Sequence, residues 1–319
     1  MRFLFLFMDG IGFGADNAAT NPFAAASLPN LTNLLDSHHM VQGVAPLETE
    51  RATLLELDAG LGVGGLPQSA TGQATLLTGK NVSKLIGEHY GPKPTREIAG
   101  IVRQDNLFIQ LQQRGYKAAL LNAYPQRYFD AVESGRRLLS AIPLAVTSAG
   151  IPLKTAADYY AGAAFSVDFT GQGWREQLGY TDAPLMSPDE AGRKLAAVSA
   201  SYDLAFFEFW PSDYAGHHQD HVAAMRMLES FDAVLGGLLA NWDDNEGLIL
   251  VTSDHGNMED LSNRHHTVNP VPALVIGTKE LRDKFSQGLK DLTDVTPAIL
   301  QFYPPNSLRA PQHFPPRPK

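Results

Sequence analysis

Short apolar runs recur along the chain and are separated by stretches with other patterns. The runs lie at residues 3–8, 118–122, 204–209, 248–252 and 273–276. Runs of this length that are rich in branched and aromatic residues are typical of buried strands. The pattern therefore predicts several central strands spread over most of the chain.

Helix patterns lie between several of these runs. Residues 29–35 and 222–239 place apolar residues at helical spacing, and residues 106–114 do so before a glycine that is typical of a helix end. Ser187 and Pro188 begin another helix, with a capping hydroxyl before a proline at the first position. Strands that alternate with helices predict an α/β fold, in which helices sandwich a mostly parallel sheet.

Two stretches depart from this alternation. Residues 40–68 form the first, and they contain a glycine-rich segment, residues 60–67, that is expected to form a loop leading to a site. Residues 125–186 have little periodicity, and we interpret them as a small inserted cap. The catalytic core would then consist of residues 1–124 and 187–319. The proline-rich segment from Pro304 is expected to wrap the surface.

Composition narrows the class of protein. The chain has 319 residues, 44% of them hydrophobic, which is ample for a large core. The net charge is −9 without a long basic cluster, so we expect no nucleic-acid partner. The absence of cysteine excludes disulfides, thiolate metal sites and cysteine nucleophiles. The N-terminal apolar run is too short for a signal peptide or a membrane span, so we expect a soluble, cytoplasmic protein. The oligomeric state is not predicted.

Side chains that commonly bind metals follow three of the predicted strands. Asp9 follows the first strand, Asp213 and His217 follow residues 204–209, and Asp254 and His255 follow residues 248–252. Open α/β sheets place their chemistry at the carboxyl ends of strands. Carboxylates and imidazoles together suit zinc or manganese. The Asp-His-Gly-Asn segment is also good turn chemistry, so by itself it leaves both interpretations open.

Ser69 stands where a loop gives way to a predicted helix. Free backbone N–H groups and the positive end of the helix dipole favour an anion there, either a phosphate or an ionised serine. The alternative is that Ser69 only caps the helix. His218 and His221 lie near His217, but adjacent residues point in different directions, so we interpret these two as solvated.

Taken together, these segments resemble the alkaline phosphatase superfamily, and within it the cofactor-independent phosphoglycerate mutase and phosphopentomutase branch. The resemblance covers most of the chain outside the cap, and its motifs occur in the family's order. Gln73 departs from the mutase pattern, which usually has histidine there. The motifs are Ser69 with Gly72 and Gly79 at the family's spacings, Asp213-x-x-Gly-His217, Asp-His-Gly-Asn-Met-Glu at residues 254–259, and His266-Thr267 with Asn-Pro-Val-Pro at residues 269–272.

The resemblance implies two divalent ions, Mn²⁺ or Zn²⁺. Their charge would exceed that of three aspartates, which suits a phosphate and lowers the pKa of the serine nucleophile. Two metals about 4 Å apart can polarise a phosphoryl oxygen and stabilise the leaving oxygen. Ser69 would attack phosphorus in line and form a phosphoserine. The implied ligands are Asp9, Ser69, Asp254 and His255 for one metal, and Asp213, His217 and His266 for the other.

Two assignments have rivals in the sequence. Thr71 is the alternative nucleophile, although the spacing to the two glycines favours Ser69. His265 is the alternative ligand to His266, although the His-Thr order favours His266.

We expect a phosphatase or phosphodiesterase that acts on a small phosphorylated substrate. A mutase must exclude water from its phosphoenzyme, and a short cap is less able to do so. Arg127, Arg136 and Arg137 could contact phosphate or carboxylate from the cap, although each could also be an ordinary surface residue. A phosphomutase is the alternative, and a non-catalytic phosphoanion-binding protein is a remote one. A sulfatase is disfavoured because the Ser69 segment lacks the Pro and Arg of that class.

Overall fold

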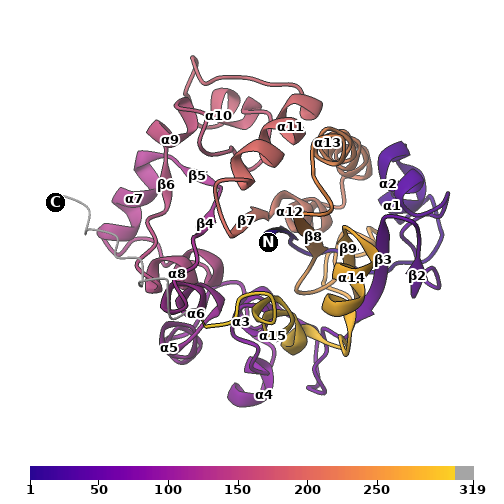
Figure 1. Cartoon of the computed structure of the whole chain (residues 1–319), viewed down its shortest axis with the longest axis horizontal. Helices are drawn as coiled ribbons and strands as arrows, with labels where there is room; N and C mark the ends of the chain where they lie inside the picture. Colours follow the sequence, from indigo (N-terminus) through magenta and orange to yellow (C-terminus); the bar gives the residue numbers. More distant parts are fainter. Residues whose placement is uncertain (306–319) are drawn as a thin grey trace.

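A seven-stranded sheet forms the centre of the computed structural model, which describes residues 1–305 (Figure 1). Its strand order is β2-β3-β9-β8-β1-β7-β4, and β5 and β6 form a separate pair. The strands are β1 (Arg2–Met8), β2 (Leu47–Glu48), β3 (Ala52–Leu57), β4 (Ala118–Leu120), β5 (Ala123–Tyr124), β6 (Lys154–Thr155), β7 (Leu204–Phe209), β8 (Gly247–Thr252) and β9 (Val271–Ile276).

The centre of the sheet is parallel, and the predicted α/β fold is confirmed. β1 pairs in parallel with β7 and β8, and β4 continues the parallel half beyond β7. All residues of β7 and β8 are buried, which explains their continuous apolar sequence. All five predicted strands are present, and their ends differ from the predicted ones by no more than two residues.

The other half of the sheet is antiparallel and was only partly predicted. β9 runs antiparallel to β8, and β3 runs antiparallel to β9. The sequence did not indicate β2 or β3, because Thr53 and Glu56 interrupt the apolar run of β3. Residues 60–67 form a loop as expected, with no helix or strand.

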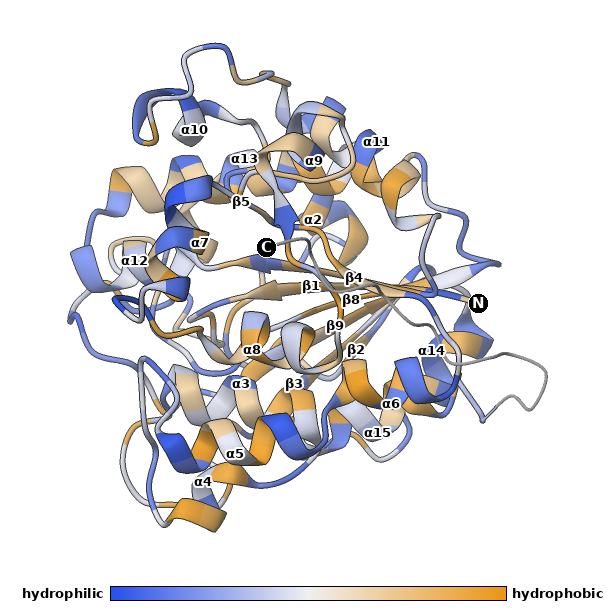
Figure 2. Cartoon of the chain, turned by 90° about the vertical axis from the view of Figure 1, so that its left-hand side faces the viewer, coloured by the Kyte–Doolittle hydropathy of each residue, from blue (hydrophilic) through white to orange (hydrophobic). Residues whose placement is uncertain are grey.

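Helices cover both faces of the sheet (Figure 2). Alternating residues of β1 explain this: Phe3 and Phe5 belong to one hydrophobic cluster, and Leu4 and Leu6 to the other. On the phenylalanine side lie α3 (Ser69–Thr78), α4 (Val82–Ile86), α5 (Arg96–Gln104), α6 (Leu107–Gln113), α8 (Ala141–Ser148), α14 (Lys279–Ser286), the short 3₁₀ helix η1 (Leu292–Asp294) and α15 (Val295–Leu300); on the other side lie α1 (Pro22–Ala25), α2 (Pro29–Leu34), α11 (Pro188–Ser199) and α13 (His221–Leu239).

Residues 125–186 contain several short elements with a small core of their own, in which Tyr159 stacks on Trp174. However, α8 lies within this segment and packs on α5 and α6 of the main core. The division into core and cap stays a prediction, and the expected surface wrapping beyond Pro304 falls mostly outside the described residues. The elements not yet named are α7 (Gln126–Glu133), α9 (Ala156–Tyr160), α10 (Gln172–Glu176) and α12 (Pro211–His218).

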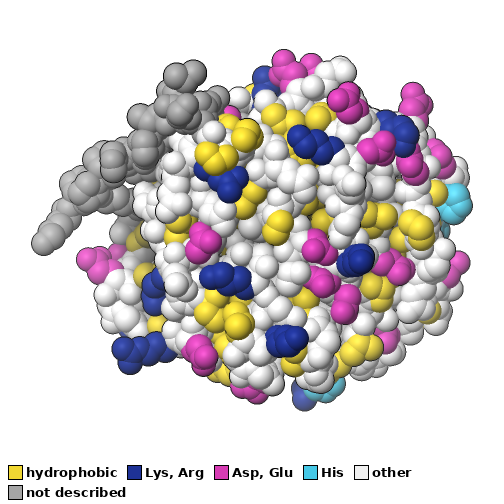
Figure 3. Space-filling model, turned by 60° about the horizontal axis from the view of Figure 1, so that its bottom comes forward, with side chains coloured by type: hydrophobic (Ala, Val, Ile, Leu, Met, Phe, Trp, Pro, Cys, Tyr) yellow, Lys and Arg dark blue, Asp and Glu magenta, His cyan; other side chains and the backbone are white. Residues whose placement is uncertain are grey.

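On the face drawn in Figure 3, acidic and basic side chains are scattered over the described surface. None of the helices in residues 1–305 combines the length and apolar character that a membrane crossing requires.

Gly72 tests how tightly α3 packs against Asp254, which lies just beyond the carboxyl end of β8. A Cβ on Gly72 would lie 2.8 Å from the backbone oxygen of Asp254. Gly72→Ala should therefore lower the free energy of unfolding by roughly 1–3 kcal/mol through overpacking. The matched control is Gly100→Ala in α5, where a Cβ would meet nothing within 4 Å. That change should raise stability by up to about 1 kcal/mol, as alanine normally does in a helix. Urea denaturation measures both, and equal effects would contradict the packing argument.

Candidate metal centre

The predicted ligands come together at the carboxyl end of the parallel strands. Asp9 directly follows β1, and Asp254 and His255 follow β8 after one intervening serine. α12 follows β7 and carries Asp213 and His217 four residues apart, so both side chains lie on the same face of the helix. The sheet thus brings together segments that are far apart in the sequence.

The first group of ligand atoms surrounds the ring of His255. Its Nε2 lies 3.0 Å from Ser69 Oγ, 3.4 Å from Asp9 Oδ1 and 3.6 Å from Asp254 Oδ2. Asp9 Oδ1 and Asp254 Oδ2 are buried without a hydrogen-bond partner. One ring nitrogen carries at most one proton and cannot satisfy three oxygens, so these atoms fit a shared cation.

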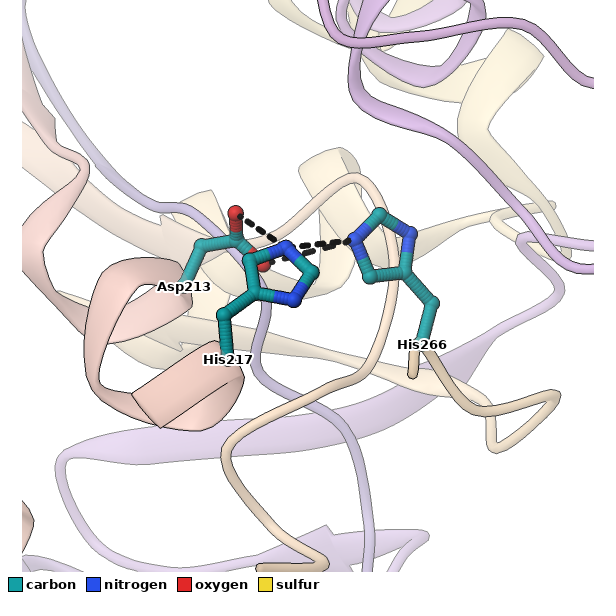
Figure 4. Close-up of side chains that lie close together, drawn as sticks. All are labelled: Asp213, His217 and His266. Atoms are coloured by element: carbon teal, nitrogen blue, oxygen red, sulfur yellow. Dashed lines mark hydrogen bonds and ion pairs between the residues drawn. The ribbon is translucent and has the colours of Figure 1, made fainter. Parts of the chain in front are cut away.

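The second group consists of Asp213, His217 and His266, which point toward one another in Figure 4. His217 Nε2 lies 3.3 Å from Asp213 Oδ2 and 3.3 Å from His266 Nε2. Each ring has its Nδ1 2.7 Å from a backbone carbonyl, that of Arg264 for His217 and that of Pro67 for His266. If each Nδ1–H donates to that carbonyl, both Nε2 lone pairs face one point, an arrangement common among metal-bound histidines.

The electrostatics of these side chains also favour cations. Burial, reinforced by Asp213, raises the pKa of Asp254 to about 7, and burial raises the pKa of Asp9 as well. Burial lowers the pKa of His255 and of His266 to about 4, so both rings are neutral at neutral pH. Burial opposes the ionisation of Asp213, but hydrogen bonding to His217 keeps its pKa well below the usual range. Neutral imidazoles beside crowded carboxylates fit divalent metals.

Several supporting residues were not predicted to have a role in the site. Asn257 donates from Nδ2 to Asp213 Oδ1 at 2.7 Å and so orients that carboxylate. Buried Glu259 accepts from the backbone N–H of Asn257 at 2.7 Å and of Gly12 at 3.0 Å, and from the hydroxyl of Thr267. The sequence did point to these residues, because Asn257 and Glu259 belong to the motif at residues 254–259 on which the family resemblance rests.

Glu208 was also missed, although it is an acid within the apolar run of β7. Burial raises its pKa to about 7, while nearby Lys93 acts in the opposite direction. Tyr124 lies with its hydroxyl 3.5 Å from Glu208 Oε2. Lys93 is close enough to Asp9 and Arg137 for both to affect its pKa, which burial lowers. A partly buried cluster of charged residues therefore adjoins the predicted metal ligands.

The residues considered as alternatives to the predicted nucleophile and ligands lie in other environments. Thr71 Oγ1 donates to the backbone oxygen of Gln68 at 3.1 Å and accepts from the N–H of Tyr90 at 3.2 Å. His265 is exposed, whereas His266 is buried. His218 is exposed and stacks on Tyr214. His221 is the first residue of α13.

The alternative interpretation of Ser69 as a helix cap is wrong, because Gln68 occupies the capping position and Ser69 is the first helical residue.

The cap arginines do not form one group. Arg127 and Arg137 line a cavity of about 370 Å³ together with Glu208. Arg137 also lies over the ring of Tyr128, 4.9 Å from its centre. Arg136 is exposed and donates to Ser134.

Fold and site together define an α/β metalloenzyme. The model of the metalloenzyme superfamily matches residues 145–304, and the chain belongs to this family. Two similar proteins are 2,3-bisphosphoglycerate-independent phosphoglycerate mutases. The one from Rhodopseudomonas palustris is 34% identical over 131 residues, which cover 38% of this chain and 25% of that protein. The one from Vibrio atlanticus is 34% identical over 130 residues, with the same coverage. The chain thus matches about a quarter of the length of these relatives.

Solved structures show the same fold along nearly the whole chain. The PH0037 protein from Pyrococcus horikoshii has a TM-score of 0.56 at 16% identity, covering 96% of this chain and 97% of that one. Alkaline phosphatase from the Antarctic bacterium TAB5 has a TM-score of 0.55 at 13% identity, covering 96% and 98%. The expected place in the alkaline phosphatase superfamily, near the phosphoglycerate mutase branch, is confirmed.

The metal-free protein should lose stability as the pH rises from about 6.5 to about 8. Asp254 and Glu208 have native pKa values of about 7, above those of the unfolded chain, so the native state holds extra protons that are lost in this window. His255 and His266, with lowered pKa values, oppose this trend up to about pH 7, because their imidazoles still bind protons in the unfolded chain there. The expected decrease is roughly 1 kcal/mol per carboxylate. Denaturation across this range measures it, and saturating Mn²⁺ or Zn²⁺ should abolish the part due to Asp254, a predicted ligand, and leave the part due to Glu208. A decrease unchanged by metal would contradict the assignment.

His266→Ala should reduce bound metal by about one equivalent per chain, because its Nε2 is part of the second group. The matched control is His265→Ala, which removes an exposed neighbouring imidazole and should leave the metal content unchanged. Metal analysis of dialysed protein measures both. An unchanged metal content in His266→Ala, or a loss confined to His265→Ala, would show that the wrong histidine was chosen.

Proposed function

We propose that this chain is a phosphatase or phosphodiesterase that works through a phosphoserine at Ser69. The observation that carries the proposal is the 3.0 Å separation of Ser69 Oγ and His255 Nε2, with Asp9 and Asp254 beside the same nitrogen. The Ser69 hydroxyl lies among predicted metal-ligand atoms and at the N-terminus of α3. Both surroundings favour the ionised serine that acts as a nucleophile.

The residues assigned to the metals form two sets. When bound, Mn²⁺ or Zn²⁺ would supply Lewis acidity toward a phosphoryl oxygen and would lower the pKa of the serine hydroxyl. The sets are Asp9, Ser69, Asp254 and His255 for one ion, and Asp213, His217 and His266 for the other.

The remaining chemistry belongs to the chain itself. Ser69 Oγ would attack phosphorus, forming the Oγ–P bond as the bond from phosphorus to the leaving oxygen breaks. The N-terminus of α3 would stabilise the negative charge of the phosphoryl group. Water would then cleave the Oγ–P bond and regenerate the serine. Thr71 is less suited to this role, because its hydroxyl is already engaged with backbone groups of Gln68 and Tyr90.

Arg127 and Arg137 are the stronger candidates for contacts with the substrate. Both line the cavity that also contains Glu208, which lies close enough to Asp254 for each to influence the other's charge. Guanidinium groups there would bind a phosphate or carboxylate of a small phosphorylated substrate. Arg136 has less support, because its guanidinium donates to nearby Ser134 and, unlike the other two arginines, it does not line this cavity.

A phosphomutase is the second candidate, favoured by the names of the relatives that match the chain. A mutase must exclude water from its phosphoenzyme, and a cap as short as residues 125–186 is less able to close over it. We therefore place the hydrolase first, and a non-catalytic phosphoanion-binding protein last.

Ser69→Ala should reduce phosphate release from an aryl phosphate by at least about 10³-fold, because the hydroxyl that forms the covalent intermediate is lost. The assay uses protein loaded with Mn²⁺ or Zn²⁺ and measures inorganic phosphate. Thr71→Val is the matched control within α3 and should retain activity within about tenfold, provided that it folds normally.

The outcomes separate the candidates. Near-normal release by Ser69→Ala would overturn the nucleophile assignment. No release by the metal-loaded wild type, together with phosphoryl exchange on a sugar or glycerate phosphate, would establish the mutase instead.

A further inference from the structure

A cavity of about 830 Å³, larger than the one lined by Arg127 and Arg137, lies beside α12. It is bounded by this helix, α13 and residues 167–188. Its volume is within the range of sites that bind small organic molecules. Its walls are mainly apolar and aromatic. They include Phe169, Trp174, Leu185, Trp210, Tyr214 and Phe231.

Closely packed aromatic rings form the floor of this cavity. Buried Phe169 stacks on Phe209, with ring centres 5.5 Å apart, and lies against Phe231 at 6.2 Å. Packing of this kind favours fixed side-chain positions, as in a protein core.

The rim, in contrast, presents large apolar side chains to solvent. Trp210 is 46% exposed, Tyr214 57% and Leu185 51%. Single exposed apolar residues are common, but three of them around one concave site indicate a binding surface. A ligand that covered them would bury apolar area that water now contacts.

The cavity adjoins the one that is lined by the candidate substrate contacts. Val167, Trp174, Leu178 and Trp210 line both this cavity and the cavity that contains Arg127, Arg137 and Glu208. Trp210 immediately precedes α12, and Tyr214 lies within this helix next to Asp213. The two adjoining cavities thus offer a polar part lined by Arg127, Arg137 and Glu208, and an apolar part beyond Trp210.

We propose that the apolar part binds the organic group of the substrate, and that the substrate is a phosphate ester with a bulky alkyl or aromatic group. This assignment rests on the proposed function, because it takes the metal centre as the place of the phosphoryl group. The arginines match the anionic end of such an ester, and the aromatic walls match its apolar end. A three-carbon glycerate phosphate would leave the apolar part unfilled.

The test measures binding and does not need turnover. Metal-loaded wild-type protein is titrated with methylphosphonate and with hexylphosphonate, which carry the same head group and are not hydrolysed. Two of the three tryptophans, Trp174 and Trp210, line the cavity, so tryptophan fluorescence reports occupancy. Hexylphosphonate should bind at least tenfold more tightly, since each fully buried methylene contributes a factor of roughly four.

A matched pair of variants tests whether the preference for the hexyl chain arises in this cavity. Leu185 and Leu138 are both exposed leucines within residues 125–186, but only Leu185 lines this cavity. Leu185→Ser should weaken hexylphosphonate binding several-fold and leave methylphosphonate binding unchanged, whereas Leu138→Ser should change neither. Equal affinity for the two phosphonates, or an advantage of the hexyl chain that both variants retain in full, would overturn the proposal.

Failure of the proposed hydrolase activity can be distinguished from failure of the apolar subsite. If no phosphate ester is turned over but the hexyl preference persists and depends on Leu185, the hydrolase is wrong and the apolar subsite stands. If esters are turned over at Ser69 without any preference for chain length, the hydrolase stands and the apolar subsite is wrong.

Discussion

The crowding of carboxylates and imidazoles at one end of the sheet is the constraint on which the rest of this structure depends. Asp9, Asp254 and Asp213 contribute negative charge within a region from which water is largely excluded, and the rings of His255 and His266 stack with centres 3.8 Å apart. Burying charge in this way is costly unless it is paired. Divalent cations are the partners that offset both the repulsion and the unbonded lone pairs. Burial and the repulsion between these carboxylates also raise the pKa values of Asp9 and Asp254.

The fold holds these groups in place through contacts that leave no room for larger side chains. Gly216 shows why a glycine precedes His217: a Cβ there would lie 2.5 Å from the side-chain amide of Asn257. That amide in turn bonds Asp213. Glu259 connects the β1 and β8 ends through backbone bonds to Gly12 and Asn257. The motif residues therefore form one bonded unit, in which supporting side chains fix the orientation of the predicted ligands.

These contacts also explain what the sequence could predict. The parallel strands were predictable because burial on both faces leaves an apolar run. Most of the predicted ligands follow such runs, whereas Ser69 and His266 were assigned from the family resemblance. β3 was not predictable, because it is half polar and pairs with β9, more than 200 residues away in the chain. Glu208 was overlooked for a related reason: one acid in a strand pattern carries no local signal. Its environment arises only when Tyr124 and Lys93 are brought to it by the fold.

The same helix connects the metal centre with the apolar cleft. α12 presents Asp213 and His217 to the predicted metal site, while Trp210 and Tyr214 line the cavity beside it. A substrate that fills this cavity would press against the helix that positions two of the predicted ligands. Binding energy from the organic group could then be used to align the phosphoryl group with Ser69, because interactions with non-reacting parts of a substrate can contribute to catalysis. Recognition and chemistry would be coupled through one rigid element.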